Sequence, residues 1–580
     1  MTKILITFFT LITIVFPQQI ILDEDFSDWT DDMLVYSDSL DDNQSSINFG
    51  KLYVNDDEEF IYFLLEVGTE INLQDNNSIN LFIDTDNNSS TGLSKDGIGV
   101  DFQFTFGERR GKYYFSNGSS VNVFHDDIEL INSPTVTSDR FEFCIYKSSV
   151  ISGNILYPSD NIKIIVEDTG SDRLPDLGSV DYAMKKNLIE YKSYSISKLN
   201  EDHLRILSYN VERDSPFDNN KKAYFERIIK AVNPDVIGFQ EIYDHSAAEV
   251  KNFVQSILPD ETWYSSSAVP DIIVVSKFPV KKSAQTDGNG IFLLDLRPKY
   301  DSDLFFISAH PPCCTNDIER QEEIDAFMAF LRDSKNGTSS IPIEENTPIV
   351  IVGDMNLVGL KRQQTTLITG DIFYNGIYGA DFNPDWDETA LADSKPITTN
   401  TNTTFTWFSE SSSFFPGRLD YVVYSNSVLE KENGFSLFTR ALPADSLTKY
   451  NLQKEDVVNA SDHIPLVVDF SFKNAVSVND KEEIPTEFGL NQNFPNPFNP
   501  NTTIEYSIPN NVGTTHELST QVSLKVYDVL GNEIATLVNE TKQPGNYKVN
   551  FDAHGFPSGV YIYKLNTAGL SQVRKMMLLK

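Results

Sequence analysis

The sequence predicts a multidomain protein in which an α/β domain lies between two all-β domains. At 580 residues the chain is several times longer than a typical domain of about 100–150 residues. Its first and last parts consist of short runs of alternating apolar and polar residues, which are typical of β-sandwiches. The part between them has apolar runs that end in polar residues and precede segments with helical spacing.

The composition sets the conditions under which a substrate is bound. The chain has 84 Asp and Glu against 46 Lys and Arg, a formal net charge of −38. Such a surface repels nucleic acid and anionic membranes, so a polyanionic substrate must be received locally, at a bound cation. Three cysteines, Cys144, Cys313 and Cys314, are too few for a disulfide framework. A bond between the adjacent pair would close a strained ring, so we interpret them as ordinary thiols.

Residues 1–19 are interpreted as an export signal. Lys3 supplies a positive start, and the apolar run from Ile4 to Phe16 is too short to span a bilayer. The residues around Pro17 lack the small-x-small pattern of a usual cleavage site, so no cut is predicted. No later run reaches about 18 apolar residues. The mature chain is therefore expected to have no transmembrane segment.

Residues 20–198 are expected to form the first β-sandwich. Strand-like runs such as Phe60–Leu65 and Asn80–Ile83 are separated by residues that favour turns. The segments Phe26–Trp29 and Phe82–Asn88 resemble those of the family-9-like carbohydrate-binding sandwich domains. The resemblance implies a glycan partner. A sugar site needs an aromatic platform, however, and Trp29 is equally well explained as a core residue.

This first domain also contains a candidate calcium site. Asp84, Asp86 and Asn88 stand two residues apart, a spacing that lets one turn direct several oxygens at a hard cation such as Ca²⁺. A solvated turn rich in Asp and Asn explains the same residues. Both interpretations stay open at this point.

Residues 200–473 repeat one pattern, an apolar strand that ends in a polar residue. The run Leu204–Asn210 ends in an amide, and apolar residues then recur at helical spacing from Phe225 to Val232. Later runs end in or adjoin Glu241, His310, Asp354, Asn356, Asp420, Asp462 and His463. A scaffold that presents polar groups at strand ends builds a rigid polar site.

These motifs follow the order of a known family. They are Ser-Tyr-Asn-Val at Asn210, Gln-Glu at Glu241, Ser-Ala-His at His310, Gly-Asp-Met-Asn at Asp354 and Asn356, Arg-Leu-Asp-Tyr at Asp420, and Ser-Asp-His at His463. The region resembles the endonuclease/exonuclease/phosphatase family, to which pancreatic deoxyribonuclease, neutral sphingomyelinases and inositol polyphosphate phosphatases belong. The resemblance implies a deoxyribonuclease-like α/β four-layer sandwich and a metal-dependent phosphoric ester hydrolase.

The resemblance also implies the metal ligands. Glu241, with Asn210 beside it, would hold Mg²⁺ or Mn²⁺, because hard cations take oxygen ligands and retain waters that a phosphate can displace. Asp462 is assigned to a further metal site. Asp354 would position the attacking water or share in metal binding.

The catalytic roles follow in the same way. His463 would be the general base, or the imidazolium that pairs with the phosphate, and Asp420 would orient its ring. Asn356 and His310 would donate hydrogen bonds to the phosphate, where negative charge accumulates.

Some features depart from family members or carry no clear role. Abasic-site endonucleases of the family carry Tyr and Asn where this chain has His310–Cys314, so DNA repair is disfavoured. In the deoxyribonuclease branch an acidic residue supports the first histidine, and no match can be chosen between Asp260 and Asp295. Arg320 follows at the head of a helix, and we interpret it as a helix-surface arginine rather than a phosphate ligand.

The C-terminal region is expected to be a sorting domain. Residues 474–487 are polar, as in a linker, and residues 488–580 contain the run Asn493–Pro500 and strand-like segments such as Val522–Asp528 and Ser558–Tyr563. This region closely resembles the C-terminal sorting domain of the bacterial type IX secretion system. The resemblance implies a small β-sandwich, the secretion machinery as partner, and a secreted or cell-surface location.

The favoured function is a secreted, divalent-metal-dependent phosphodiester hydrolase, with extracellular nucleic acid as the preferred substrate class. Two other enzymes are alternatives, a sphingomyelinase-like lipase and a phosphatase for inositol or sugar phosphates. A lipase needs an exposed apolar loop, for which Ser411–Phe415 is a short candidate, although buried packing explains it more simply. A further alternative, from another class, is a catalytically dead surface protein that binds glycan.

Overall fold

The structure is a computed structural model that describes residues 19–38, 47–170, 172–187, 191, 194–297, 299–473, 488–509, 520–542, 544–567 and 569–580. The predicted export signal before Gln19 and the predicted linker at 474–487 lie outside these residues. The chain divides into two compact units, Met1–Lys473 and Asn474–Lys580. Within the described part, every helix is too short or too polar to cross a bilayer.

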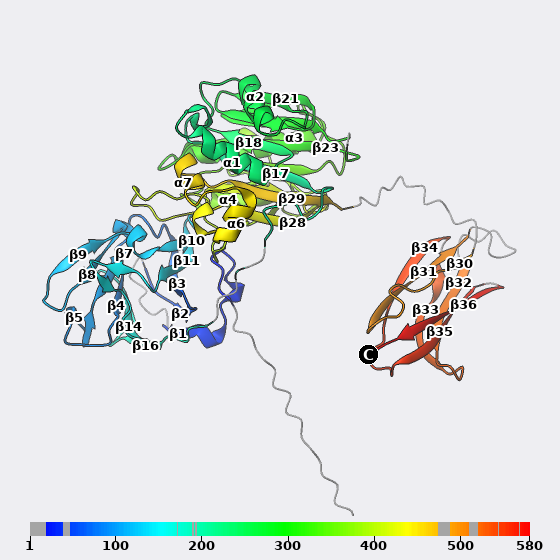
Figure 1. Cartoon of the computed structure of the whole chain (residues 1–580), viewed down its shortest axis with the longest axis horizontal. Coiled ribbons are helices and arrows are strands. Elements are labelled where there is room, and N and C mark those ends of the chain that lie inside the picture. The colour runs from blue at the N-terminus through cyan, green and yellow to red at the C-terminus, as the bar shows by residue number, and fades with distance from the viewer. Residues whose placement is uncertain are drawn as a thin grey trace, which may run out of the picture. The chain divides into compact units, whose positions relative to one another are not determined.

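The first part of the larger unit is all-β, as expected for a sandwich (Figure 1). One sheet has the order β1 (Leu34–Ser37), β2 (Lys51–Asp56), β3 (Phe60–Ile71), β11 (Ser138–Tyr146) and β10 (Ile131–Ser133). The other has the order β15 (Arg173–Leu174), β14 (Asn161–Asp168), β4 (Ile79–Asp84), β7 (Phe102–Thr105), β8 (Arg110–Tyr114) and β9 (Ser120–Val123), and β16 (Val180–Ala183) also pairs with β14. Alternate residues of both sheets, including Phe63, Phe143 and Phe104, form one buried core.

Trp29 belongs to a smaller core beside this sandwich. Its side chain is buried and packs edge-on against Tyr53, with ring centroids 6.3 Å apart. Its indole N–H donates to Glu142 Oε2 at 3.2 Å. The core interpretation of Trp29 is therefore confirmed, and this residue offers no platform for a sugar.

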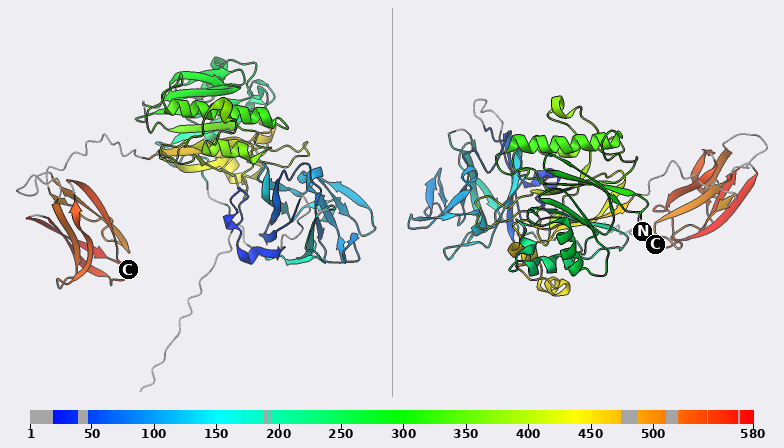
Figure 2. Two further views of the ribbon diagram at one scale, coloured as in Figure 1. Left: turned by 180° about the vertical axis from the view of Figure 1, so that it is seen from behind. Right: turned by 90° about the horizontal axis from the view of Figure 1, so that it is seen from above.

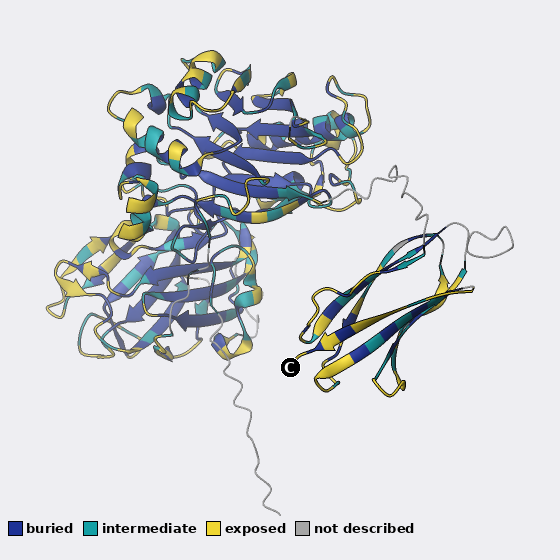
Figure 3. Ribbon diagram, turned by 45° about the vertical axis from the view of Figure 1, so that its right-hand side comes forward, coloured by how far each residue is buried: buried dark blue, intermediate teal, exposed yellow. Residues whose placement is uncertain are grey.

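Two larger sheets form the middle of the unit (Figure 2). The first has the order β19 (Tyr264–Val269), β20 (Ile272–Ser276), β18 (Val236–Gln240), β17 (Leu204–Asn210), β29 (Leu466–Phe472), β28 (Leu429–Ser436) and β26 (Ile397–Thr398). The second has the order β21 (Val280–Thr286), β22 (Asn289–Asp295), β23 (Asp303–Ala309), β24 (Ile349–Asp354), β27 (Asp420–Tyr424) and β25 (Ala392–Asp393). Their central strands are buried throughout (Figure 3), because each is covered on both faces.

Helices cover the outer face of each sheet. Helices α1 (Lys222–Val232) and α2 (Ala247–Ile257) pack on the first sheet, and α3 (Asp317–Lys335) and α4 (Lys361–Thr369) on the second. The shorter helices are α5 (Asn375–Tyr378), α6 (Ala444–Tyr450) and α7 (Asp456–Ala460). Residues between the sheets, such as Ile206 and Phe306, form a third core. The predicted deoxyribonuclease-like four-layer sandwich is confirmed.

The smaller unit is also all-β, as predicted. Strands β30 (Gly489–Leu490), β31 (Asn501–Ile508) and β34 (Gly545–Asp552) form one sheet. Strands β33 (Glu533–Lys542), β32 (Thr520–Tyr527), β35 (Gly559–Thr567) and β36 (Leu570–Leu578) form the other. Leu524, Tyr563 and Ile504 are among the residues of its core.

Candidate active site

Polar side chains of both middle sheets meet at one edge because of the direction of the strands. Parallel pairs β17–β18 and β23–β24 bring their carboxyl ends to this edge. The antiparallel neighbours β20, β29 and β27 begin at the same edge, so they contribute the residues at or just before their first position. The ends supply Asn210, Glu241, His310, Asp354 and Asn356, and the starts supply Asp271, Asp420 and His463.

One carboxylate oxygen, Asp354 Oδ2, lies at the centre of this cluster. It accepts from Asn210 Nδ2 at 3.0 Å and from Asn356 Nδ2 at 3.2 Å. It also lies 3.4 Å from His463 Nε2 and 3.6 Å from His310 Nε2. The structure thus brings both predicted histidines and both predicted amides to one buried acid.

Asn210 joins this acid to Glu241. Its Nδ2 also donates to Glu241 Oε1 at 3.1 Å, while its Oδ1 accepts the Glu212 N–H at 3.1 Å. Glu241 adopts a left-handed backbone conformation with φ of 64° and accepts the Arg213 N–H at 3.0 Å. Asn210 therefore orients two carboxylates, and its own oxygen is engaged by the backbone.

His310 is held by an acid that the sequence did not reveal. Its Nδ1 lies 2.8 Å from Asp271 Oδ2, and its backbone N–H donates to Asn289 Oδ1 at 2.9 Å. Burial disfavours the charged ring, but the hydrogen bond to Asp271 and the charges of Asp354, Asp271 and Glu241 outweigh it, so the pKa of His310 is raised. Asp271 directly precedes β20, and no motif distinguishes it from the other acids between Asp260 and Asp295.

His463 and Asp420 form a fully buried pair, as expected from the sequence. His463 Nδ1 lies 2.8 Å from Asp420 Oδ2, and the Asp420 N–H donates to Thr406 Oγ1 at 2.8 Å. Burial opposes a charged imidazole, yet the charges of Asp420 and Asp354 prevail and raise the pKa of His463 to about 10. The other ring nitrogen, Nε2, is directed to Asp354 and to the centre of the cluster.

Two backbone features keep the end of β24 in place. Gly353 has φ of 139°, and a Cβ there would lie 1.9 Å from Ala309 O, so only glycine lets β24 approach β23 this closely. Asn356 is left-handed at φ of 49° and donates from Nδ2 to Pro311 O at 3.0 Å. His310 and Asp354 therefore emerge from two strands in close contact.

Residues 207–463 match the sequence model of the Endonuclease/Exonuclease/phosphatase family. The middle domain belongs to this family. Residues 492–579 match the secretion system C-terminal sorting domain. This match indicates that the chain is exported and is either secreted or held at the cell surface. No curated protein matches the chain.

Several solved structures resemble the chain at low sequence identity. The human Nocturnin catalytic domain is 15% identical, with 47% of this chain and 95% of that one covered and a TM-score of 0.31. An endonuclease/exonuclease/phosphatase from Beutenbergia cavernae is 13% identical over 64% of this chain and 100% of its own, with a TM-score of 0.30. A 3′ phosphatase from Neisseria, bound to a product DNA hairpin, is 14% identical over 46% and 99%, with a TM-score of 0.29.

Asp462 is held by the loop that contains Trp407. Its Oδ2 accepts from Trp407 Nε1 at 3.0 Å, and its carbonyl accepts the Phe408 N–H at 2.9 Å. Trp407 also forms a backbone bridge with His463. Trp407 could not be predicted from the strand pattern, because it lies in a loop rather than beside a strand.

The donor set of this candidate site suits a hard divalent cation. Asp354, Asp420 and His463 offer ligand atoms within 4.8 Å of one another. Both ring nitrogens of His463 already face carboxylates, however, so this trio is better explained as an imidazole between two acids. Among the described residues, no Lys or Arg forms an ion pair with Glu241, Asp354 or Asp420, which leaves concentrated negative charge for a metal to balance.

The structure corrects the interpretation of Arg320. It is not a helix-surface residue, because its side chain is fully buried and donates to the carbonyls of Pro312 and Cys314 and to Asp317 Oδ1. Arg320 thus fixes the loop that follows His310. Cys313 and Cys314 are free, exposed thiols in that loop, as interpreted.

The predicted calcium residues lie around one turn after β4. Asp84 and Asp86 lie close to a third acid, Asp101, which the spacing argument did not include. Asn88 contributes mainly its backbone, since its N–H donates to Asp84 Oδ1 and Asp86 Oδ1 at 3.0 and 2.9 Å. Burial, followed by the charge of Asp86, raises the pKa of Asp101 to about 6.

Proposed function

We propose that the middle domain hydrolyses phosphate esters with Mg²⁺ or Mn²⁺, and that it does so outside the cell. One observation carries the proposal. Glu241, Asp354, His310 and His463 converge at one edge of two sheets, and the described residues place no Lys or Arg in an ion pair with these acids. A cluster of oxygen donors beside two imidazoles suits metal-assisted attack of water on phosphorus.

We assign the metal to the side of the cluster where Glu241 and Asp354 face each other across Asn210. When bound, the cation would neutralise phosphoryl oxygens and supply a Lewis acid. Asn210 holds both carboxylates in place through its amide group. Asp462 remains a candidate ligand for a further ion, presented by Trp407.

His463 is proposed as the general base, or as the imidazolium that pairs with the phosphate. Asp420 fixes the ring by accepting from Nδ1, which leaves Nε2 to act at the centre of the site. Asp354, 3.4 Å from Nε2, is placed to position the attacking water. His310 and Asn356 complete the site as donors to phosphate oxygens.

Extracellular nucleic acid remains the preferred substrate class. A sorting domain at residues 492–579 directs the chain outward, where polymeric phosphodiesters are a source of phosphate and nucleosides. The lipase alternative is weakened because Phe415 is buried, leaving Phe414 alone exposed at the tip of that loop. Phosphatase activity on inositol or sugar phosphates stays the second enzyme candidate.

The other regions keep their predicted roles as proposals. We propose an export signal at 1–19, a sandwich at 20–198, the hydrolase domain at 200–473, a linker at 474–487 and the sorting domain at 488–580. Glycan binding by the first sandwich rests on resemblance alone. A dead enzyme is disfavoured because each motif keeps its metal or base residue.

A side-by-side assay tests the proposal. The purified chain is incubated with plasmid DNA, RNA, sphingomyelin, inositol phosphates and bis-p-nitrophenyl phosphate, with Mg²⁺ or Mn²⁺ and with EDTA. We expect metal-dependent cleavage of nucleic acid that is lost in EDTA and in His463→Ala. If no phosphate ester is hydrolysed under any metal condition, the proposed function is wrong.

A further inference from the structure

One loop of the hydrolase domain connects its active site to the core of the first sandwich. We call residues 404–418 the strap. It leads into β27, whose first residue is Asp420. Its two ends lie close together at the hydrolase site, and its tip lies in the sandwich.

The tip of the strap is part of the sandwich core. Phe415 is 1% exposed, and its ring lies 5.6 Å from that of Phe104 and 6.1 Å from that of His125. The Phe415 N–H donates to Gln74 Oε1 at 2.9 Å, and His125 Nε2 lies 2.9 Å from Ser412 O. A hydrolase residue thus fills a socket in the core of the sandwich.

The base of the strap holds the active-site residues. Thr406 Oγ1 accepts the N–H groups of Leu419 and Asp420, and Thr406 O accepts the Ile464 N–H at 2.7 Å. Trp407 exchanges backbone hydrogen bonds with Gly417 and donates its indole N–H to Asp462. Asp420 and the segment from Asp462 to Ile464 are therefore both bonded to the base of the strap.

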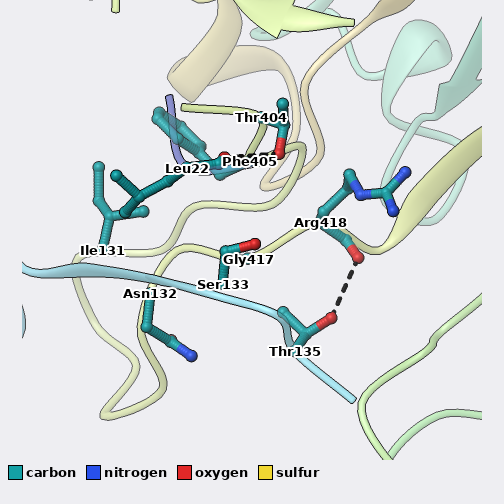
Figure 4. Close-up of a pocket in the computed structure, with 9 residues that line it drawn as sticks. All are labelled: Leu22, Ile131, Asn132, Ser133, Thr135, Thr404, Phe405, Gly417 and Arg418. Carbon is teal, nitrogen blue, oxygen red and sulfur yellow. Dashed lines mark hydrogen bonds between the residues drawn. The ribbon is translucent and has the colours of Figure 1, made fainter. Parts of the chain in front are cut away.

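Between tip and base, the strap lies directly against the sandwich (Figure 4). Thr135 Oγ1 donates to Arg418 O at 3.3 Å, and a Cβ on Gly417 would lie 2.5 Å from Thr135 Cγ2. Thr404 Oγ1 donates to Leu22 O at 3.0 Å on the neighbouring N-terminal segment. These contacts hold the strap against the sandwich and the N-terminal segment around a small pocket, which Thr135, Thr404 and Arg418 help to line.

A buried ion pair fixes the last residue of the strap. The Arg418 guanidinium pairs with Glu24 at 3.0 Å and with Asp393 at 2.7 Å, and all three side chains are largely buried. Glu24 comes from the segment that precedes the sandwich, and Asp393 from the hydrolase domain. A charge removed from water in this way holds its partners in one geometry.

We propose that the first sandwich is a positioning element of the hydrolase. By burying Phe415 it fixes the strap, and through Trp407 and Thr406 the strap fixes Asp462, His463 and Asp420. Phe415, Gln74 and Trp407 are positioning residues for a site on another domain. The inference rests on the proposed hydrolase function for its kinetic consequence, but its structural consequence is independent of any activity.

The kinetic test compares two neighbouring phenylalanines of the strap in the full chain. Phe415→Ala is expected to lower kcat for bis-p-nitrophenyl phosphate by about 10- to 100-fold with a smaller change in KM, because His463 and Asp420 are displaced while Glu241, Asn210 and His310 lie at the ends of strands that form no hydrogen bond with the strap. Phe415→Leu refills the socket and is expected to restore most of kcat. Phe414→Ala is the matched control: its side chain is 49% exposed and contacts the Arg109 guanidinium at 4.1 Å, so it should lose much less of kcat than Phe415→Ala.

Two milder variants, Gln74→Ala and Trp407→Phe, test the proposal even if Phe415→Ala does not fold. Gln74→Ala removes a bond made by the sandwich, and Trp407→Phe removes only the indole donor to Asp462. Both are expected to lower kcat by several-fold with a wild-type melting curve. The proposal is overturned if all these variants stay within about twofold of wild type, or if Phe414→Ala loses as much as Phe415→Ala.

Hydrogen exchange separates this inference from the proposed function. In Phe415→Ala, backbone amides at 404–408 and 461–464 are expected to exchange faster than in wild type, while those of β17 and β18 do not change. Unchanged exchange at 404–408 and 461–464 overturns the inference, whatever the activity. Faster exchange in a chain that hydrolyses no phosphate ester would sink the proposed function and leave the positioning role standing.

Discussion

At the scale of single residues, the main property of the site is that few positively charged groups surround its carboxylates. Asp354 touches two amides and faces two imidazoles, and each imidazole has its own second acid. This arrangement keeps both rings oriented and raises their pKa in the metal-free protein. A divalent cation would add the positive charge that the side chains lack.

Asp271→Asn tests the acid that supports His310. Removing the anion destabilises the charged ring, so the pKa of His310 should fall, which is the opposite of the shift seen in the intact site. Activity is expected to drop by about 10- to 100-fold, because the ring loses its orienting partner. NMR titration of the metal-free protein measures the first effect, and steady-state kinetics the second. If the pKa of His310 is the same in Asp271→Asn as in wild type, Asp271 does not support this ring.

Sequence reasoning found residues whose signal is local. His310, Asp354 and His463 each end or adjoin an apolar run, and together with the resemblance to the endonuclease/exonuclease/phosphatase family this pattern predicted that they form one site. Asp271 could not be found in this way because no motif separates it from the other acids between Asp260 and Asp295, and Trp407 could not because it lies in a loop. The prediction that Arg320 lies on the helix surface was wrong, because helical spacing does not show which face of a helix is covered by the loop before it.

At the scale of elements, close approach of β23 and β24 depends on one glycine. Gly353→Ala would place a Cβ 1.9 Å from Ala309 O on a backbone that L side chains rarely adopt. We expect a loss of unfolding free energy on the order of 3 kcal/mol, together with loss of activity. Gly434→Ala in β28 is the control, since its nearest neighbour would lie at 3.6 Å. Denaturant unfolding of both variants checks the difference, and equal stability would contradict it.

The turn after β4 gives a prediction with a defined pH dependence. The pKa of Asp101 is raised from 3.8 to about 6, so its contribution to stability is full below pH 3.8 and lost as pH rises through about 6. A bound cation would reverse this loss. About 1 mM Ca²⁺ should therefore raise the melting temperature at about pH 7.5 and much less at about pH 5, where a proton must be displaced. Asp101→Asn should abolish the difference; a melting temperature that Ca²⁺ changes at neither pH would favour a simple solvated turn.

The bounds of helices and strands were predicted well where apolar residues recur with one clear period. The helix from Lys222 to Val232 buries the four apolar residues that predicted it, and the strand Leu204–Asn210 has the expected bounds. The strap was beyond this approach. Buried packing was correctly predicted for Phe415, but the sequence does not show which domain's core contains this side chain.

At the scale of the whole molecule, charge governs encounter with substrate. A net charge of −38 repels a polyanion at long range, and salt screens this repulsion. Raising NaCl from about 20 mM to about 150 mM should lower KM for plasmid DNA, the reverse of the usual salt dependence of nucleic-acid binding. KM for bis-p-nitrophenyl phosphate serves as the control and should change little. A KM for DNA that rises with salt would point to a basic binding surface instead.

The order of the domains was predictable because each has its own pattern of apolar residues. The dependence of one domain on another was not, because no local pattern reports a contact between residues 74 and 415.

The socket for Phe415 also limits how these domains can be recombined. A sandwich excised for use as a portable tag would expose an aromatic hole to water, and a hydrolase trimmed at its own boundary would leave a bare phenylalanine at the tip of a loop. Shuffling of the two domains, in the laboratory or in evolution, must therefore carry the loop and its receptor together or repair both at once.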